Sequence, residues 1–157
     1  MIKTGDSLPN VSFSLLTEDG ASNPTTADLF DGKKVVLFAL PGAFTPTCSA
    51  SHLPGYVVHA DTIKAKGVDS IICLSVNDSF VMKAWGDASN AENIIMLADG
   101  GAAFTKAIGL DMETGDFGGV RSQRYAMVVD NGVVTTLNIE EAGAFEASSA
   151  ETILDTL

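Results

Sequence analysis

The hydrophobic pattern of the chain alternates between short apolar runs and amphipathic stretches. The runs KVVLFAL (34–40) and DSIICLSV (69–76) are continuous and rich in β-forming residues, as expected of strands buried on both faces of a sheet. IIMLAD (94–99) indicates a third strand of this kind. Because such strands need helices above and below them, the pattern predicts an α/β fold.

A long helix is predicted from about Pro46 to Lys66, directly after the first of these strands. Apolar residues recur there at steps of three and four, and Gly67 follows as a C-terminal signal. This spacing places the apolar residues on one stripe of the helix, which faces the core. The stripe consists of Leu53, Tyr56, Val57, Ala60 and Ile63.

The remaining elements are predicted from turn and capping signals. Asn131-Gly132, between YAMVVD and VVTTLNI, is a strong hairpin signal. Asn77 or Asp78 offers an N-cap for a helix in SFVMKAWGD. Weaker patterns indicate an early strand at 11–16, a short helix near 27–30, a helix in AAFTKAIG ended by Gly109, and a serine-capped helix in SSAETILDTL.

This order of elements fits one domain over residues 1–157 with a thioredoxin-like fold. A mixed sheet would have helices on both faces and an N-terminal extension. The length allows a substantial core, and 46% hydrophobic against 18% charged residues is typical of a globular chain. The sequence contains no linker, repeat or low-complexity tract.

The charge and the cysteine count exclude several classes of partner and cofactor. Nine basic and 20 acidic residues give a net charge of −11, which disfavours nucleic acid and anionic membrane surfaces. No run approaches the roughly 18 apolar residues of a membrane span. Two cysteines and two histidines are too few for a disulfide scaffold or a structural zinc site, so no metal or cofactor is expected.

The N-terminal segment MIKTGDSLPNVSF has neither an apolar core nor a cleavage pattern of a secretory signal. The expected location is therefore the cytoplasm, or an organelle if a targeting peptide was removed. A reducing compartment would keep both thiols free.

The most informative stretch is PGAFTPTCS (41–49), which connects the first buried strand to the long helix. Pro46 suits the first helical position, which makes Thr45 the N-cap and places Cys48 in the first turn. Free backbone N–H groups and the positive end of the helix dipole stabilise a thiolate there. A lone cysteine is more often a small buried hydrophobe, but this setting favours a nucleophile.

PGAFTPTCS resembles the active-site loop of the peroxiredoxins, in the form used by the type II (peroxiredoxin-5-like) subgroup. The resemblance continues through HLPGYV, KAKGVDSIICLSVNDSFVMKAW, LADG and RYAMVVDNGVV, and so covers most of the chain. It implies a thiol peroxidase that reduces hydrogen peroxide or organic hydroperoxides to water or alcohol. The reacting cysteine becomes a sulfenic acid.

Matched to the family's motif, Cys48 is the peroxidatic cysteine and Thr45 positions peroxide and thiolate. Pro41 lines the pocket. Arg124, in RSQRYAMVV, matches the active-site arginine that stabilises the thiolate and the charge on the leaving oxygen, whereas Arg121 does not match. Full ionisation of an ordinary cysteine gains only about 30-fold, or about 2 kcal/mol, so these neighbours must supply the rest.

The cysteine that resolves the oxidised thiol is left open by the sequence. Cys73 lies in a predicted buried strand, which favours an inert core thiol. The resemblance implies that some members use a cysteine at this position, and others one in the loop before the last helix. Here that loop, EEAGAFEASSAETIL, has none. The resolving partner is then Cys73 or, by a small preference, an external thiol of glutathione, glutaredoxin or thioredoxin.

Other residues suggest roles that the sequence argues for or against. His52, four residues after Cys48, invites a Cys–His catalytic pair, but the family needs no histidine base and we expect a helix-surface residue. Phe44, in an exposed turn, indicates an interface, and the resemblance implies a homodimer beside this loop. Phe80, Met82 and Trp85 are expected to pack in the core or at its rim.

Two other functions fit the same fold less well. One is a thioredoxin-fold redox sensor that passes peroxide oxidation to a partner protein. The other is a papain-like hydrolase, which is weakened by the lack of a matched histidine with an orienting partner. Consumption of peroxide with a recycling thiol distinguishes the enzyme from the sensor.

Overall fold

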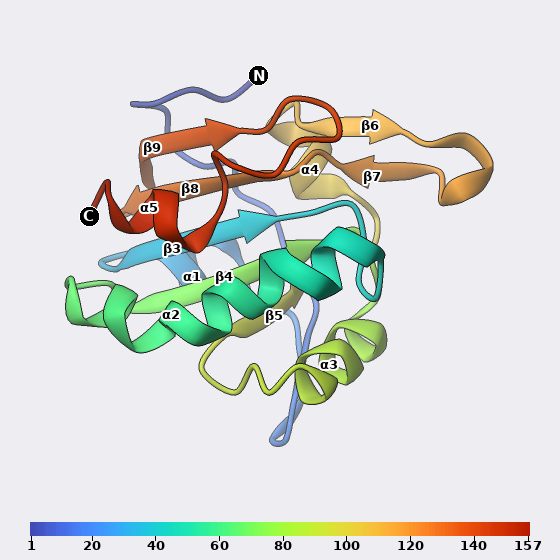
Figure 1. The fold of residues 1–157 in the computed structure, drawn as a ribbon, viewed down its shortest axis with the longest axis horizontal. Helices are drawn as coiled ribbons and strands as arrows, with labels where there is room; N and C mark the ends of the chain where they lie inside the picture. The colour runs from blue at the N-terminus through green and yellow to red at the C-terminus, as the bar shows by residue number, and fades with distance from the viewer.

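The computed structural model describes residues 1–157 and is built around a five-stranded mixed sheet of order β5-β4-β3-β8-β9 (Figure 1). β3, β4 and β5 are parallel, and β8 and β9 continue the sheet in antiparallel fashion. This is the mixed α/β sheet that the sequence predicts. Its strands are β3 (Lys34–Ala39), β4 (Ser70–Ser75), β5 (Ile95–Ala98), β8 (Tyr125–Asp130) and β9 (Val133–Ile139).

Helices and the N-terminal extension cover the two faces of the sheet and form two apolar cores. Alternate residues of β3 face opposite cores: Val36 and Phe38 belong to one, Val35 and Leu37 to the other. This explains why β3 is apolar throughout. The first core contains residues of α2 (Leu53–Ala65), α3 (Ser79–Ala88) and α5 (Ala150–Leu154); the second contains residues of α1 (Thr26–Phe30) and α4 (Ala103–Ala107).

The local signals are confirmed where their chemistry is strong. Asn131 and Gly132 have φ of 49° and 80°, as the tight turn between β8 and β9 requires. The Asp78 side chain caps α3 by accepting a hydrogen bond from the Val81 amide at 2.9 Å. Ser149 caps α5 in the same way. None of the helices has both the length and the apolar character needed to cross a bilayer.

The predicted helix at 46–66 begins at Pro46 and ends at Ala65, but it contains a wider, π-helical turn, η1 (Cys48–His52). The Leu53 amide donates to the Cys48 carbonyl, five residues back. In the wider turn Cys48, His52 and Leu53 are all buried. Leu53 was expected to face the core, but the wider turn itself was not predicted.

Two short hairpins differ from the sequence-based expectation. The strand expected at 11–16 begins later in the chain. β1 (Leu15–Thr17) pairs with β2 (Gly20–Ser22), whereas Ser12 and Ser14 form only single bridges. No element was predicted between 110 and 124. There β6 (Asp111–Glu113) and β7 (Val120–Ser122) form a hairpin around the turn η2 (Gly115–Phe117), which projects from the sheet in Figure 1.

Candidate active site

Sheet register gathers three distant segments at one edge of the sheet. β3 ends at Ala39, which pairs with Tyr125 at the start of β8, and Tyr125 pairs with Ile139 at the end of β9. The residues just outside these strands therefore meet at the carboxyl end of β3, on the right in Figure 1. These residues are the turn from Pro41 to Thr47, Arg124 and Glu140.

The turn after β3 is anchored from the neighbouring strand. The Ala43 amide donates to Asn77 Oδ1 at 3.0 Å, and the Ser75 hydroxyl donates to the same oxygen at 2.6 Å. Asn77 was predicted only as a possible helix cap, and it serves instead as this anchor. Phe44 has a φ of 62°, which is uncommon for a residue with a bulky side chain, and its ring is 56% exposed.

Cys48 lies in the first turn of the helix with its thiol buried beside a guanidinium group. Its relative exposure is 1%, and Arg124 Nη2 donates to Cys48 Sγ at 3.2 Å. Pro46 occupies the first helical position, and the Thr45 carbonyl accepts from the Ser49 amide at 2.9 Å, as an N-cap carbonyl does. A fixed positive charge and a helix N-terminus therefore converge on this sulfur.

Thr45 and Pro41 are both half-buried in the turn before Cys48. The Thr45 hydroxyl donates to the Gly42 carbonyl at 2.7 Å and does not cap the helix. Its proton is thereby engaged, and its oxygen lone pairs are left free to accept a hydrogen bond.

The expectation that His52 lies on the helix surface is wrong. It is completely buried, Arg124 Nη1 donates to its Nδ1 at 2.8 Å, and its Nε2 lies 3.1 Å from the Ser148 carbonyl. Burial, and then the Arg124 charge, lower the pKa of His52 to about 3. His52 lies four residues after Cys48, so the two side chains share the buried face of the helix.

Arg121 has a structural role near the turn that precedes Cys48. Its Nε donates to the Gly118 carbonyl at 3.0 Å and its Nη1 donates to the Val76 carbonyl at 2.9 Å. It therefore ties β7 to the end of β4, and its guanidinium makes no hydrogen bond to Cys48. This agrees with its lack of a match to the motif.

The aromatic residues after β4 divide between the core and the surface. Trp85 and Met82 are buried, as predicted, and the Trp85 indole donates to Ser49 Oγ at 3.0 Å. Phe80 is 71% exposed, so its expected packing in the core or at its rim is wrong. It lies in the first turn of α3, where its ring faces outward.

Cys73 lies in the middle of β4, opposite Phe38 of β3. It is completely buried in the same apolar core as Cys48, and both thiols are free. Burial, and to a smaller extent the neighbouring Cys48, raise the pKa of Cys73 well above its ordinary value. The prediction of a buried thiol in this strand is confirmed.

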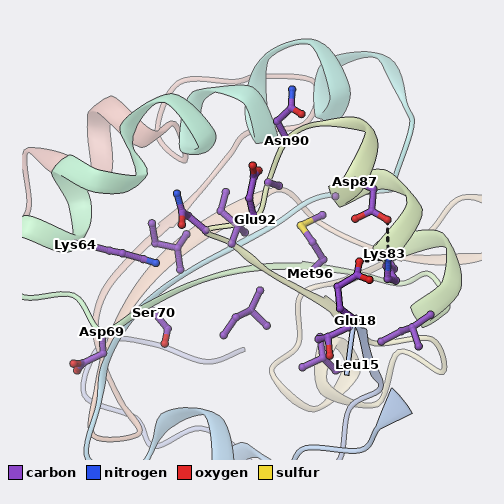
Figure 2. A pocket seen from close by; sticks show the side chains of 18 residues that line it. Leu15, Glu18, Lys64, Asp69, Ser70, Lys83, Asp87, Asn90, Glu92 and Met96 are labelled. Carbon is purple, nitrogen blue, oxygen red and sulfur yellow. Dashed lines mark hydrogen bonds and ion pairs between the residues drawn. The ribbon is translucent and has the colours of Figure 1, made fainter. Parts of the chain in front are cut away.

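A cavity of about 650 Å³ lies at the opposite end of the parallel strands (Figure 2). Its walls include the starts of β4 and β5, the hairpin strand β1 and the last turns of α3. Lys83 crosses one side and pairs with Glu18 at 3.0 Å and with Asp87 at 2.8 Å. No cysteine or histidine lines it, so it is separate from the site around Cys48.

A thiol that accepts a hydrogen bond from a guanidinium in the first turn of a helix, beyond the carboxyl end of a strand in a thioredoxin-like sheet, indicates a thiol-based redox enzyme. Comparison with known proteins agrees. Residues 3–154 match the Redoxin family. The chain is 50% identical to Peroxiredoxin-2E-2, chloroplastic, of Oryza sativa subsp. japonica, with 99% of this chain and 72% of the relative covered. It is 46% identical to Peroxiredoxin-2D of Arabidopsis thaliana, with 99% and 98% covered.

A solved structure is also very similar. Reduced Prx3 from Vibrio vulnificus, in complex with hydrogen peroxide, has 65% sequence identity and a TM-score of 0.98 over 99% of both chains. The chain therefore belongs to the redoxin family, as a peroxiredoxin of type II, and is a thiol peroxidase.

Proposed function

We propose that Cys48 is the peroxidatic cysteine of this chain and that it reduces hydrogen peroxide and organic hydroperoxides. The observation that supports this best is the hydrogen bond from Arg124 Nη2 to Cys48 Sγ at 3.2 Å. A guanidinium stays charged at all relevant pH values, so it favours the thiolate, which is the nucleophile. The Vibrio vulnificus relative was solved with hydrogen peroxide, which supports the same substrate here.

In the first step the Cys48 thiolate attacks one oxygen of the peroxide O–O bond. An S–O bond forms, the O–O bond breaks, and the leaving oxygen departs as hydroxide or alkoxide, which takes up a proton to become water or alcohol. Cys48 is oxidised to a sulfenic acid. Negative charge moves from sulfur to the leaving oxygen. The contact of Arg124 Nη2 with Cys48 Sγ supports a role for Arg124 in stabilising the thiolate and, as proposed here, the charge on the leaving oxygen.

Thr45 and Pro41 are proposed to shape the peroxide site. Because the Thr45 hydroxyl donates to the Gly42 carbonyl, its oxygen is available to accept the O–H of a hydroperoxide. Such a contact would hold the O–O bond in line with the sulfur. Pro41 has no N–H and can exclude water without competing for these hydrogen bonds.

We propose that an external thiol from glutathione, glutaredoxin or thioredoxin regenerates Cys48. The thiol attacks the sulfenic sulfur and releases water, and a second thiol then reduces the mixed disulfide. Cys73 is poorly suited to this role, because it is fully buried and its raised pKa keeps it protonated. The loop at 140–149 contains no cysteine.

The test is peroxide consumption with glutathione and glutaredoxin, and separately with thioredoxin. Cys48→Ser should lose all but a few per cent of the turnover, whereas Cys73→Ala should retain most of it. Cys73→Ala is the matched control, since it removes the other buried thiol. Turnover in Cys48→Ser above a few per cent of the wild-type value would refute the assignment. Stoichiometric oxidation of Cys48 without turnover by any reductant would favour the redox sensor.

We further propose a homodimer whose interface includes Phe44. Phe44 is exposed in the active-site turn after β3, and Phe80, in the first turn of α3 after the parallel strand β4, is also exposed. In sedimentation experiments the wild type should be a dimer. Phe44→Asp and Phe80→Asp should each shift the equilibrium toward the monomer. Val58→Asp, at an equally exposed apolar position on α2, is the control and should leave the dimer intact. A wild type that sediments as a monomer would contradict the proposal.

The compartment stays a prediction: the cytoplasm, or an organelle if a targeting peptide was removed. Peroxiredoxin-2E-2 of rice and Peroxiredoxin-2E of Arabidopsis thaliana are chloroplastic, which supports the organelle alternative. Fractionation of the source cells, with detection of this chain, distinguishes the two.

A further inference from the structure

Both ring nitrogens of His52 are hydrogen-bonded, and the partners determine which one carries the proton. Arg124 Nη1, 2.8 Å away, is only a donor, so His52 Nδ1 must accept. The Ser148 carbonyl, 3.1 Å away, is only an acceptor, so His52 Nε2 must donate. The ring is therefore a neutral imidazole with its proton on Nε2. Because its lone pair is taken by Arg124, it is not a base for Cys48.

The same guanidinium holds His52 with one terminal nitrogen and Cys48 with the other. Nη1 donates to the ring at 2.8 Å and Nη2 donates to the sulfur at 3.2 Å. The group is planar, so fixing one terminal nitrogen fixes the direction in which the other points. The Phe145 ring lies against both, 5.9 Å from the Arg124 carbon and 5.1 Å from the imidazole.

His52 is in turn held by the loop between β9 and α5. Ser148, whose carbonyl accepts from the ring, is itself fixed by Glu140: its amide donates at 2.9 Å and its hydroxyl at 2.7 Å to Glu140 Oε2. The Glu146 amide donates to the same oxygen at 2.7 Å. Tyr56 is a second donor to the Ser148 carbonyl, at 2.8 Å.

We propose that His52 is a positioning residue that aims the Arg124 guanidinium at Cys48, with its own orientation set by the 140–149 loop. The inference rests on the proposed role of Cys48. A neutral acceptor suits this task, since a carboxylate in the same place would offset the arginine charge that the thiolate and the leaving oxygen need. The loop is thereby linked to the reacting sulfur through Ser148, His52 and Arg124.

The first test is the second-order rate constant of Cys48 oxidation by hydrogen peroxide. Stopped-flow fluorescence can follow Trp85, the single tryptophan, because its indole donates to Ser49 next to Cys48. His52→Leu should lower the rate by about 10- to 100-fold, because the guanidinium loses a hydrogen bond that orients it. His52→Asn keeps an acceptor near the position of Nδ1 and should restore most of the rate.

Two controls separate positioning from loss of packing. Tyr56→Phe removes the other hydrogen bond to the Ser148 carbonyl from an equally buried ring, without touching Arg124, and should stay within about threefold of wild type. In an Arg124→Ala background, His52→Leu should change the rate by less than about twofold, because the group that it orients is gone. A folded His52→Leu protein within about threefold of wild type, or an equal loss in both backgrounds, would overturn the proposal.

A second measurement uses the wild-type fold, so it decides even if His52→Leu does not fold. Nitrogen NMR of labelled histidine should show His52 as the neutral Nε2–H form from pH 5 to 8, and Arg124→Ala should shift its Nδ1 resonance. A ring that becomes charged in this range, or one that Arg124→Ala leaves unchanged, would refute the inference. Cys48→Ser separates the two proposals: if it keeps peroxide reduction, the role of Cys48 fails, whereas Cys48-dependent activity unaffected by His52→Leu refutes only this one.

Discussion

The two cysteines are equally inaccessible and belong to the same apolar core, yet their surroundings differ in one respect. Cys48 is 1% exposed and Cys73 is 0% exposed. Cys48 receives a hydrogen bond from the Arg124 guanidinium, whereas Cys73 lies in the middle of β4 between β3 and β5. Burial alone makes a thiol inert. A charged donor at the edge of the core, rather than exposure, therefore distinguishes the reactive thiol from the structural one.

The largest expected effect comes from removing the donor that distinguishes Cys48. Arg124→Ala should lower the second-order rate with peroxide by about a hundred- to a thousandfold, as the loss of one donor at a developing charge does elsewhere. Thr45→Val removes the proposed acceptor for the hydroperoxide O–H and should also lower this rate. Stopped-flow rates measure this, and thermal unfolding checks that the fold persists. Arg121→Ala, which removes a guanidinium that does not contact Cys48, is the control. Rates within threefold of wild type would exclude a role in the chemistry.

The second prediction concerns the oxidised protein. One equivalent of peroxide should leave Cys48 as a sulfenic acid, because a disulfide with Cys73 requires Cα atoms within about 7 Å and movement of the packed first turn. Intact mass with a sulfenic-acid trap should therefore find mainly the adduct. A rapid loss of two mass units without adduct would identify Cys73 as the resolving cysteine. In that case Cys73→Ser should also abolish turnover with thioredoxin.

Serine substitution of each cysteine tests the same difference through the free energy of unfolding. Cys73→Ser should lower the free energy of unfolding by about 1–3 kcal/mol, because its hydroxyl is buried among apolar residues of the core. Cys48→Ser should cost less, since Arg124 can donate to the new hydroxyl. Urea denaturation of both variants, with Cys73→Ala as the packing control, measures the difference. Equal losses would mean that the two sites do not differ in polarity.

A further effect is a pH dependence of the stability that arises beside Cys48. The folded pKa of His52 is about 3, below its ordinary value of 6.5, so the unfolded chain takes up a proton first as the pH falls. The stability is thus full above pH 6.5 and decreases toward pH 3, by about 1.4 kcal/mol for each pH unit. Arg124 favours the neutral ring, whereas Ser148 and Glu140 favour the charged one.

Urea denaturation between pH 6.5 and 4.5 isolates this contribution. The folded pKa of Glu140 is also lowered: burial alone would raise it, but the hydrogen bonds from Ser148, Glu146 and Ala147 outweigh that effect. The stability that Glu140 contributes is present above pH 4.5, the ordinary pKa of this side chain, and is lost only below that pH. In a His59→Asn background, which removes the other imidazole, His52→Asn should abolish the slope. An unchanged slope would contradict the neutral, buried ring.

Much of the site could be predicted because its signals are local. Thr45-Pro46-Thr47-Cys48 indicates the start of a helix, and the structure begins the helix at Pro46. The run KVVLFAL likewise indicates a strand buried on both faces, which β3 is. His52 was missed because its partners, Arg124 and the Ser148 carbonyl, come from distant segments, and no local signal in the helix indicates that they would cover the ring.

The helix start before Cys48, the buried strand of Cys73 and the hairpin at Asn131-Gly132 follow from the amino-acid sequence alone, because capping, apolar runs and turn residues act over a few neighbouring positions. The contacts of each thiol, in contrast, depend on segments that are far apart in the sequence. Arg124 lies 76 positions after Cys48, and the Ser148 carbonyl 96 positions after His52. Such pairs depend on the register of β3, β8 and β9, in which a shift of one residue would turn each side chain to the other face.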